Sequence, residues 1–227
     1  MKFFTRYGSA IFWMLALADI ALIIAELETY RVFTKPLLVP ILMVTIFART
    51  GFDKHKTSKI ILAAALALAT AGDILLLGSA NQNLFLAGLV SFLLMQLLYS
   101  VYFLRIKPFR WRHLVSISAS FLLIAFVAAT LTYLLWNALG DYRVPLIIYS
   151  FFLALMFTTA VNVYHYRISK SLALKAFIPG AALFVLSDLI LAANMFYFKE
   201  AFVGIAIMAT YCGAQFYLAR GFVKHLR

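Results

Sequence analysis

Long apolar runs follow one another along the chain, separated by short clusters of Lys, Arg, Gly and Pro. Each run approaches the roughly 20 apolar residues that a helix needs to cross a bilayer, so we predict eight spans. They cover residues 8–27, 33–48, 58–78, 83–104, 113–139, 144–165, 172–196 and 200–222. The second run is short and contains Pro36 and Pro40, so a re-entrant segment is the alternative for it.

Composition supports a membrane protein, because 65% of the 227 residues are apolar and only 12% are charged. This balance excludes a water-soluble globule, a disordered chain and a collagen-like repeat. Eight spans leave too few residues for a separate soluble domain. We therefore predict an all-α polytopic membrane helix bundle that forms a single integral membrane domain over residues 1–227.

The net charge of +12 is distributed unevenly over the predicted loops. Of the 20 Lys and Arg residues, 16 lie at the two termini and in the loops near 49–57, 105–112 and 166–171. Basic loops mark the cytoplasmic side, so both termini are predicted to be cytoplasmic. Topology and anionic lipid headgroups account for the charge without nucleic acid as a partner. The compact, basic-looped chain favours a bacterial inner membrane over the endoplasmic reticulum.

A weak internal repeat divides the chain into two halves, 1–112 and 113–227. The stretch from Asp73 to Gly88 is similar to the stretch from Asp188 to Gly204, at offsets of 115 and 116 residues. Four spans per half give a parallel repeat rather than an inverted one. The repeat predicts that Asp73 and Asp188 lie at equivalent depths on facing helices.

Asp73 and Asp188 are the main candidates for chemistry inside the spans. Each charged side chain at a helix centre costs about 2.5–3.5 kcal/mol on insertion scales, which calls for a reason. A proton-handling pair facing a cavity is the functional interpretation, and a satisfied hydrogen bond between helices is the structural alternative. Lys35 lies on the same side of the membrane, and Asp19 is a third acid that either joins the site or pairs with a neighbouring helix.

Further polar side chains accompany the aspartates, and each is either a substrate contact or an inter-helix hydrogen bond. They are Gln96, Tyr99, Tyr149, Ser187, Asn194, Tyr211 and Gln215. All four histidines lie in or beside the basic loops. An intramembrane Ser-His-acid triad and a buried histidine zinc site are therefore not expected.

These residues carry a resemblance to the YhhN-like transmembrane family, the lysoplasmalogenases. The matching segments run in order through most of the chain and are LysProLeuLeuValPro at 35–40, GlyAspIleLeuLeu at 72–76, GlyLeuValSerPheLeuLeu at 88–94 with Tyr99, Tyr149 with Met156, GlyAlaAlaLeuPheValLeuSerAspLeuIleLeu at 180–191, and Tyr211 with Gln215. Many members carry histidine where this chain has Gln96. Glutamine can donate or accept a hydrogen bond but cannot replace histidine in acid–base chemistry.

The resemblance implies a hydrolase that cleaves the vinyl ether bond of lysoplasmalogens, with Asp73 and Asp188 as catalytic residues. The products are a fatty aldehyde and a glycerophospho-ethanolamine or -choline. Such cleavage needs a protonated acid and an ionised carboxylate, and it requires neither a metal nor a cofactor. The sequence leaves open which aspartate is the acid, although the apolar neighbours of Asp73 favour it.

The expected partners are a lysophospholipid substrate and the surrounding membrane lipids, and Lys35 is the best-placed cation for the phosphate. Two other functions remain open at this point. A small proton-coupled transporter also uses intramembrane acids and repeated halves. A lysophospholipid-binding membrane protein without chemistry is the third possibility.

Overall fold

A computed structural model describes residues 2–51 and 55–227. In this part of the chain the regular secondary structure is helical, without strands, as predicted. Seven of the described helical segments are long and apolar enough to cross a membrane. An eighth helix, α10, is 24 residues long and more polar, since it carries Tyr211, Gln215 and Arg220. The predicted polytopic helical bundle is confirmed.

The eight predicted spans correspond to eight long helices. They are α1 (Lys2–Ile24), α2 (Lys35–Thr50), α3 (Lys56–Leu77), α4 (Gln82–Ile106), α5 (Leu114–Leu134), α7 (Arg143–Asn162), α9 (Ile178–Ala193) and α10 (Val203–Leu226). Short helical elements connect or extend them. These are η1 (Glu28–Phe33), η2 (Trp111–His113), α6 (Trp136–Leu139), η3 (Gly140–Tyr142), η4 (Val163–His165), α8 (Lys170–Leu172), η5 (Ala173–Phe177) and η6 (Asn194–Phe198).

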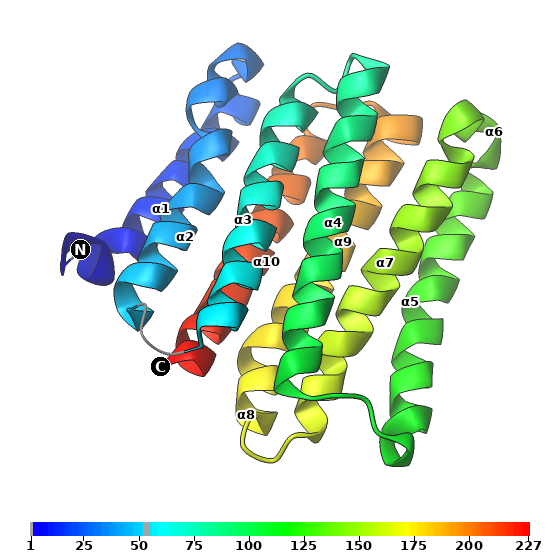
Figure 1. Cartoon of the computed structure of the whole chain (residues 1–227). Helices are drawn as coiled ribbons and strands as arrows, with labels where there is room; N and C mark the ends of the chain where they lie inside the picture. Colours follow the sequence, from blue (N-terminus) through cyan, green and yellow to red (C-terminus); the bar gives the residue numbers. More distant parts are fainter. Residues whose placement is uncertain (1, 52–54) are drawn as a thin grey trace.

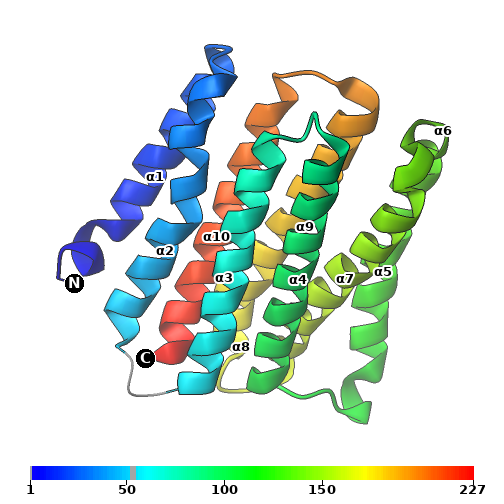
Figure 2. The same cartoon turned by 45° about the horizontal axis from the view of Figure 1, so that its top comes forward.

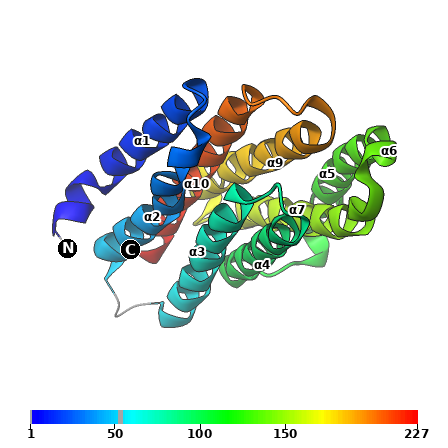
Figure 3. The same cartoon turned by 90° about the horizontal axis from the view of Figure 1, so that it is seen from above.

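The helices pack in two layers (Figure 1). One layer contains α2, α3, α4 and α7, and the second contains α1, α10 and α9, as the view from above shows (Figure 3). Helix α5 lies at the outer edge against α7. Both chain ends lie at the same end of the bundle (Figure 2). An even number of spans requires this arrangement.

The second span is a continuous helix despite its prolines. Pro36 occupies the first turn of α2, where its missing N–H removes no intrahelical hydrogen bond. Pro40 lies inside the helix and leaves the Pro36 carbonyl without its intrahelical donor, but the helix continues through it. The run is therefore a full helix and not a re-entrant segment. Its first residue is Lys35, and η1 leads into it directly from the end of α1.

Helix α9 belongs to a longer helical segment, Lys170–Phe198, that includes the π-helical turns η5 and η6. Such turns insert an extra residue into an α-helix and often occur at functional sites. The η6 turn carries Asn194 and Met195, which line a cavity inside the bundle. On α3, Gly72 allows close approach of α4, because a Cβ there would lie 2.7 Å from the Phe92 ring.

Candidate functional site

A cavity of about 210 Å³ lies between the two layers, toward the end of the bundle opposite the termini. Helices α2, α3, α4, α7, α9 and α10 contribute to its wall, and so does η1. It has room for several water molecules, since one water occupies about 10–15 Å³ on this scale. Seven residues singled out in the sequence line it, namely Lys35, Asp73, Tyr149, Ser187, Asp188, Asn194 and Tyr211.

Asp73 occupies the wall formed by α3 and α10. Its side chain is 2% exposed, and its Oδ2 accepts a hydrogen bond of 2.7 Å from the Tyr211 hydroxyl. Gln215 lies one turn farther along α10 and donates through Nε2 to the same hydroxyl oxygen at 3.3 Å. Tyr211 is thereby oriented with its proton toward the carboxyl group, so it stabilises a negative charge on Asp73.

Asp188 occupies the opposite wall, formed by α9, α7 and α4. It is partly exposed, and its Oδ2 accepts hydrogen bonds from the Tyr149 hydroxyl at 2.7 Å and from Gln96 Nε2 at 3.2 Å. Gln96 itself is fully buried. Two donors from two different helices therefore fix this carboxyl group where α4, α7 and α9 meet.

The aspartates and their partners follow the offset of the predicted repeat. Asp73 and Asp188 are 115 residues apart, and so are their partners Gln96 and Tyr211. Asp73 lies on the third span of the first half and accepts from Tyr211 on the fourth span of the second half. Asp188 lies on the third span of the second half and accepts from Gln96 on the fourth span of the first half. These hydrogen bonds join residues 1–112 to residues 113–227 at the site, and the internal repeat itself stays a prediction.

Positive charge lies at the mouth of the cavity. Lys35 is half-buried in the lining, and among the described residues it makes no hydrogen bond or ion pair. Arg31 also lines the cavity, but its guanidinium is bound to the Asp19 carboxylate, at 3.1 Å between Nη2 and Oδ2. Among the described residues that line the cavity, Lys35 is therefore the cation without an ion-pair partner, and its role in binding phosphate stays a prediction.

Asp19 does not join the two aspartates at the cavity. Besides Arg31 it accepts a hydrogen bond of 2.7 Å from the Thr34 hydroxyl, and it is fully buried. Both partners come from the segment between α1 and α2. The alternative interpretation of Asp19, a partner for a neighbouring polar group, is the one that the contacts support.

The remaining predicted residues lie around the aspartates in supporting positions. Tyr99 donates to Gln215 Oε1 at 3.4 Å, and both are buried behind the cavity wall. Ser187 lines the cavity but donates to the Ile207 carbonyl at 3.1 Å. Asn194 also lines it while its Oδ1 accepts from the Glu200 N–H at 3.0 Å.

Sequence reasoning did not include Arg31 and Glu28 in the site, although both line the cavity mouth. Their element, η1, is a short turn between two spans, where charged residues ordinarily face solvent. The apolar wall of Phe85, Leu89 and Phe92 on α4 was also missed. Its residue types are the same as those on the lipid-facing surfaces, so only the packing distinguishes them.

The arrangement suits acid–base chemistry on an amphipathic molecule. Both aspartates use Oδ2 for their hydrogen bonds, so within the described residues each Oδ1 is left without a protein donor. Two carboxyl groups on opposite walls can divide the roles of acid and base. Lys35 can bind a negatively charged headgroup, and the apolar wall formed by α4 can contact a hydrocarbon tail.

Comparison with known proteins gives one family. The sequence model of the YhhN family matches residues 30–222, which contain every predicted site residue. No curated protein and no solved structure matches the chain.

Proposed function

Because the chain belongs to the YhhN family, we propose that it is a membrane-embedded hydrolase that cleaves the vinyl ether bond of lysoplasmalogens. The observation that carries the proposal is that Asp73 and Asp188 line the same cavity from opposite walls, each with a tyrosine donor. A cavity that combines two carboxyl groups, a lysine and an apolar wall has the chemistry that a lysophospholipid with an acid-labile bond requires.

The proposed reaction begins with transfer of a proton from one aspartic acid to the β-carbon of the vinyl ether, which is the alkene carbon that is not bonded to oxygen. The resulting oxocarbenium ion is stabilised by the other, ionised aspartate, as in glycoside hydrolysis. Water then adds to the cationic carbon and gives its proton to that carboxylate. As the hemiacetal collapses, the second aspartic acid gives this proton to the leaving alcohol oxygen and the first aspartate takes the hemiacetal hydroxyl proton, which restores both groups. The products are a fatty aldehyde and the glycerophospho-ethanolamine or -choline, and the ether and one water are consumed.

The side chains around the aspartates support specific parts of this scheme. Tyr211 and Tyr149 hold the carboxyl groups in place and stabilise whichever one is ionised. Lys35 lines the cavity and supplies the positive charge that would bind the phosphate of the headgroup. Gln96 can position Asp188 but cannot transfer a proton.

The deciding experiment measures aldehyde release from alkenyl lysophosphatidylethanolamine by the purified, detergent-solubilised protein. Wild type is compared with Asp73→Asn and Asp188→Asn, which keep the size of the side chain and remove its acid. Size-exclusion profiles establish that the variants are folded. We expect aldehyde from the wild type and at least about a hundredfold loss in both variants. A folded wild type that releases no aldehyde overturns the proposal.

A further inference from the structure

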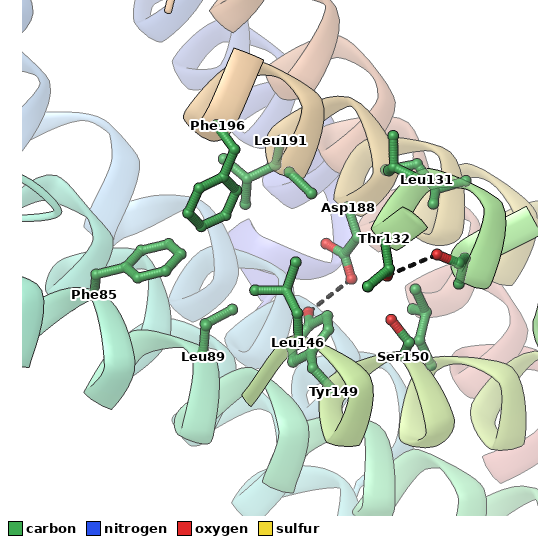
Figure 4. A pocket seen from close by; sticks show the side chains of 14 residues that line it. Phe85, Leu89, Leu131, Thr132, Leu146, Tyr149, Ser150, Asp188, Leu191 and Phe196 are labelled. Carbon is green, nitrogen blue, oxygen red and sulfur yellow. Dashed lines mark hydrogen bonds between the residues drawn. The ribbon is translucent and has the colours of Figure 1, made fainter. Parts of the chain in front are cut away.

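A small apolar pocket of about 50 Å³ opens beside Asp188. It shares Asp188, Tyr149 and Phe85 with the main cavity. Figure 4 shows Asp188 between the aromatic rings of Phe85 and Phe196 on one side and Leu131, Thr132 and Ser150 on the other. The pocket therefore leads away from the carboxyl group toward α5, at the edge of the bundle.

A groove on the outer face of α5 and α7 lies next to this pocket. The groove has a volume of about 430 Å³ and shares Thr132 and Ser150 with the small pocket. Its other lining residues are apolar or aromatic, among them Phe121, Ala129 and Phe151. The Thr132 hydroxyl donates to the Ala128 carbonyl at 2.8 Å, so the junction presents little polarity.

Small side chains create the groove. Ala125, Ala128, Ala129 and Thr132 are spaced so that they share one face of α5. Helices α5 and α7 pack directly against each other, and the small residues of α5 leave the groove at the surface of this contact. Helix α5 is also covered less by the rest of the protein than the other apolar spans. Only 11% of the residues in its apolar stretch are buried inside the protein, against 28–44% in the other six.

We propose that the groove and the small pocket bind the single hydrocarbon chain of the lipid substrate, which enters from the bilayer between α5 and α7. This inference rests on the proposed function and assigns the chain to the Asp188 side. The headgroup then lies toward Lys35 on the other side of the cavity, and the first bonds of the chain lie at the aspartates. Thr132 and Ser150 line both spaces, so the chain passes these two residues on its way from the groove to Asp188.

The groove can be filled without disturbing the core. Ala129 is exposed and lines the groove, so Ala129→Trp places a large ring in the path of the chain. Ala119 is exposed on the same helix and lines neither the groove nor the small pocket, so Ala119→Trp is the matched control. Ala125→Trp, also in the groove, is a second test in case one variant folds poorly.

Each variant is assayed with a long-chain and a very short-chain alkenyl lysolipid. We expect Ala129→Trp to lower kcat/KM for the long chain by at least about tenfold, the scale of steric effects in apolar pockets. The short chain does not reach the groove, so its kcat/KM stays the same, and Ala119→Trp changes neither. Equal effects of Ala129→Trp on both chain lengths, or no difference between Ala129→Trp and the control Ala119→Trp, overturn the inference and leave the hydrolase proposal intact.

A second measurement is independent of turnover. A lysolipid with a saturated, uncleavable ether and a photoreactive group near the chain end is crosslinked to the wild type, and the labelled peptides are identified. We expect adducts on the groove residues of α5 and α7 that excess unlabelled lysolipid suppresses. Adducts spread over all lipid-facing helices, or insensitive to the competitor, identify general bilayer contact and overturn the inference even where aldehyde release is observed.

Discussion

The surroundings of Asp73 and Asp188 differ although the two aspartates occupy similar segments of the sequence. Asp73 is nearly fully enclosed, accepts one hydrogen bond from the described residues and lines the cavity together with Lys35. Asp188 is partly exposed, accepts two hydrogen bonds and borders the apolar pocket. The two halves of the chain therefore supply the same acid in two settings, one polar and one apolar.

This difference matches the two ends of the amphipathic substrate that we propose. The side with Lys35 suits a phosphate headgroup, and the side with the apolar pocket suits a hydrocarbon chain. Asp19 offers a further contrast, because it is also buried in a span but is saturated by Arg31 and Thr34. An intramembrane acid whose hydrogen-bonding capacity is filled by its own neighbours contributes to packing, whereas the cavity aspartates keep an oxygen available.

The largest expected effect comes from removing both cavity acids. If they act as one unit, Asp73→Asn combined with Asp188→Asn is no slower than the slower single variant, because either loss already abolishes the acid–base chemistry that the two residues share. Rates of aldehyde release from the two single variants and the double variant test this. Losses that multiply in the double variant contradict a shared mechanism and indicate two independent roles.

The tyrosine donors come next in expected effect. We expect Tyr211→Phe to lower kcat by about 10–100-fold, since Asp73 loses its one hydrogen bond from the described protein, of a charge-assisted type worth about 1.5–3 kcal/mol. Tyr149→Phe is expected to cost less, because Gln96 still donates to Asp188. Steady-state kinetics of both variants give the ranking, and a larger loss for Tyr149→Phe reverses the comparison.

Lys35→Met tests the polar side of the cavity. We expect KM for the lysolipid to rise about tenfold with a smaller change in kcat, because a cation that binds the phosphate acts on the bound substrate and its transition state alike. Lys199→Met is the control, since Lys199 is exposed near the same end of the bundle and does not line the cavity. If Lys35→Met and Lys199→Met have equal KM values, Lys35 does not bind the substrate.

The smallest effect is expected at Gln96. Gln96→Leu removes one hydrogen bond of 3.2 Å and is expected to lower kcat about two- to tenfold, the range for a neutral donor. Gln96→His can restore a ring N–H donor and is expected to recover part of that loss. Kinetics and thermal unfolding of the two variants separate a local effect from lost stability. Recovery above the wild-type rate assigns a proton-transfer role to this position.

The spans, their order and the placement of the acids followed from the sequence. Hydropathy and charge are properties of consecutive residues, so eight runs and the basic loops predict the bundle without knowledge of its packing. The pairing of Asp73 with Asp188 was predictable because carboxyl groups are costly in a membrane and therefore stand out in an apolar chain.

The tertiary structure alone decided which side chains meet those acids. The Tyr211–Asp73 and Gln96–Asp188 hydrogen bonds join residues 138 and 92 positions apart, and the rotation of each helix about its axis determines whether they form. The same rotation directs Asp19 toward Arg31 and leaves the groove between α5 and α7. All faces of these helices are apolar, so the sequence carries no strong periodic signal that fixes the rotation.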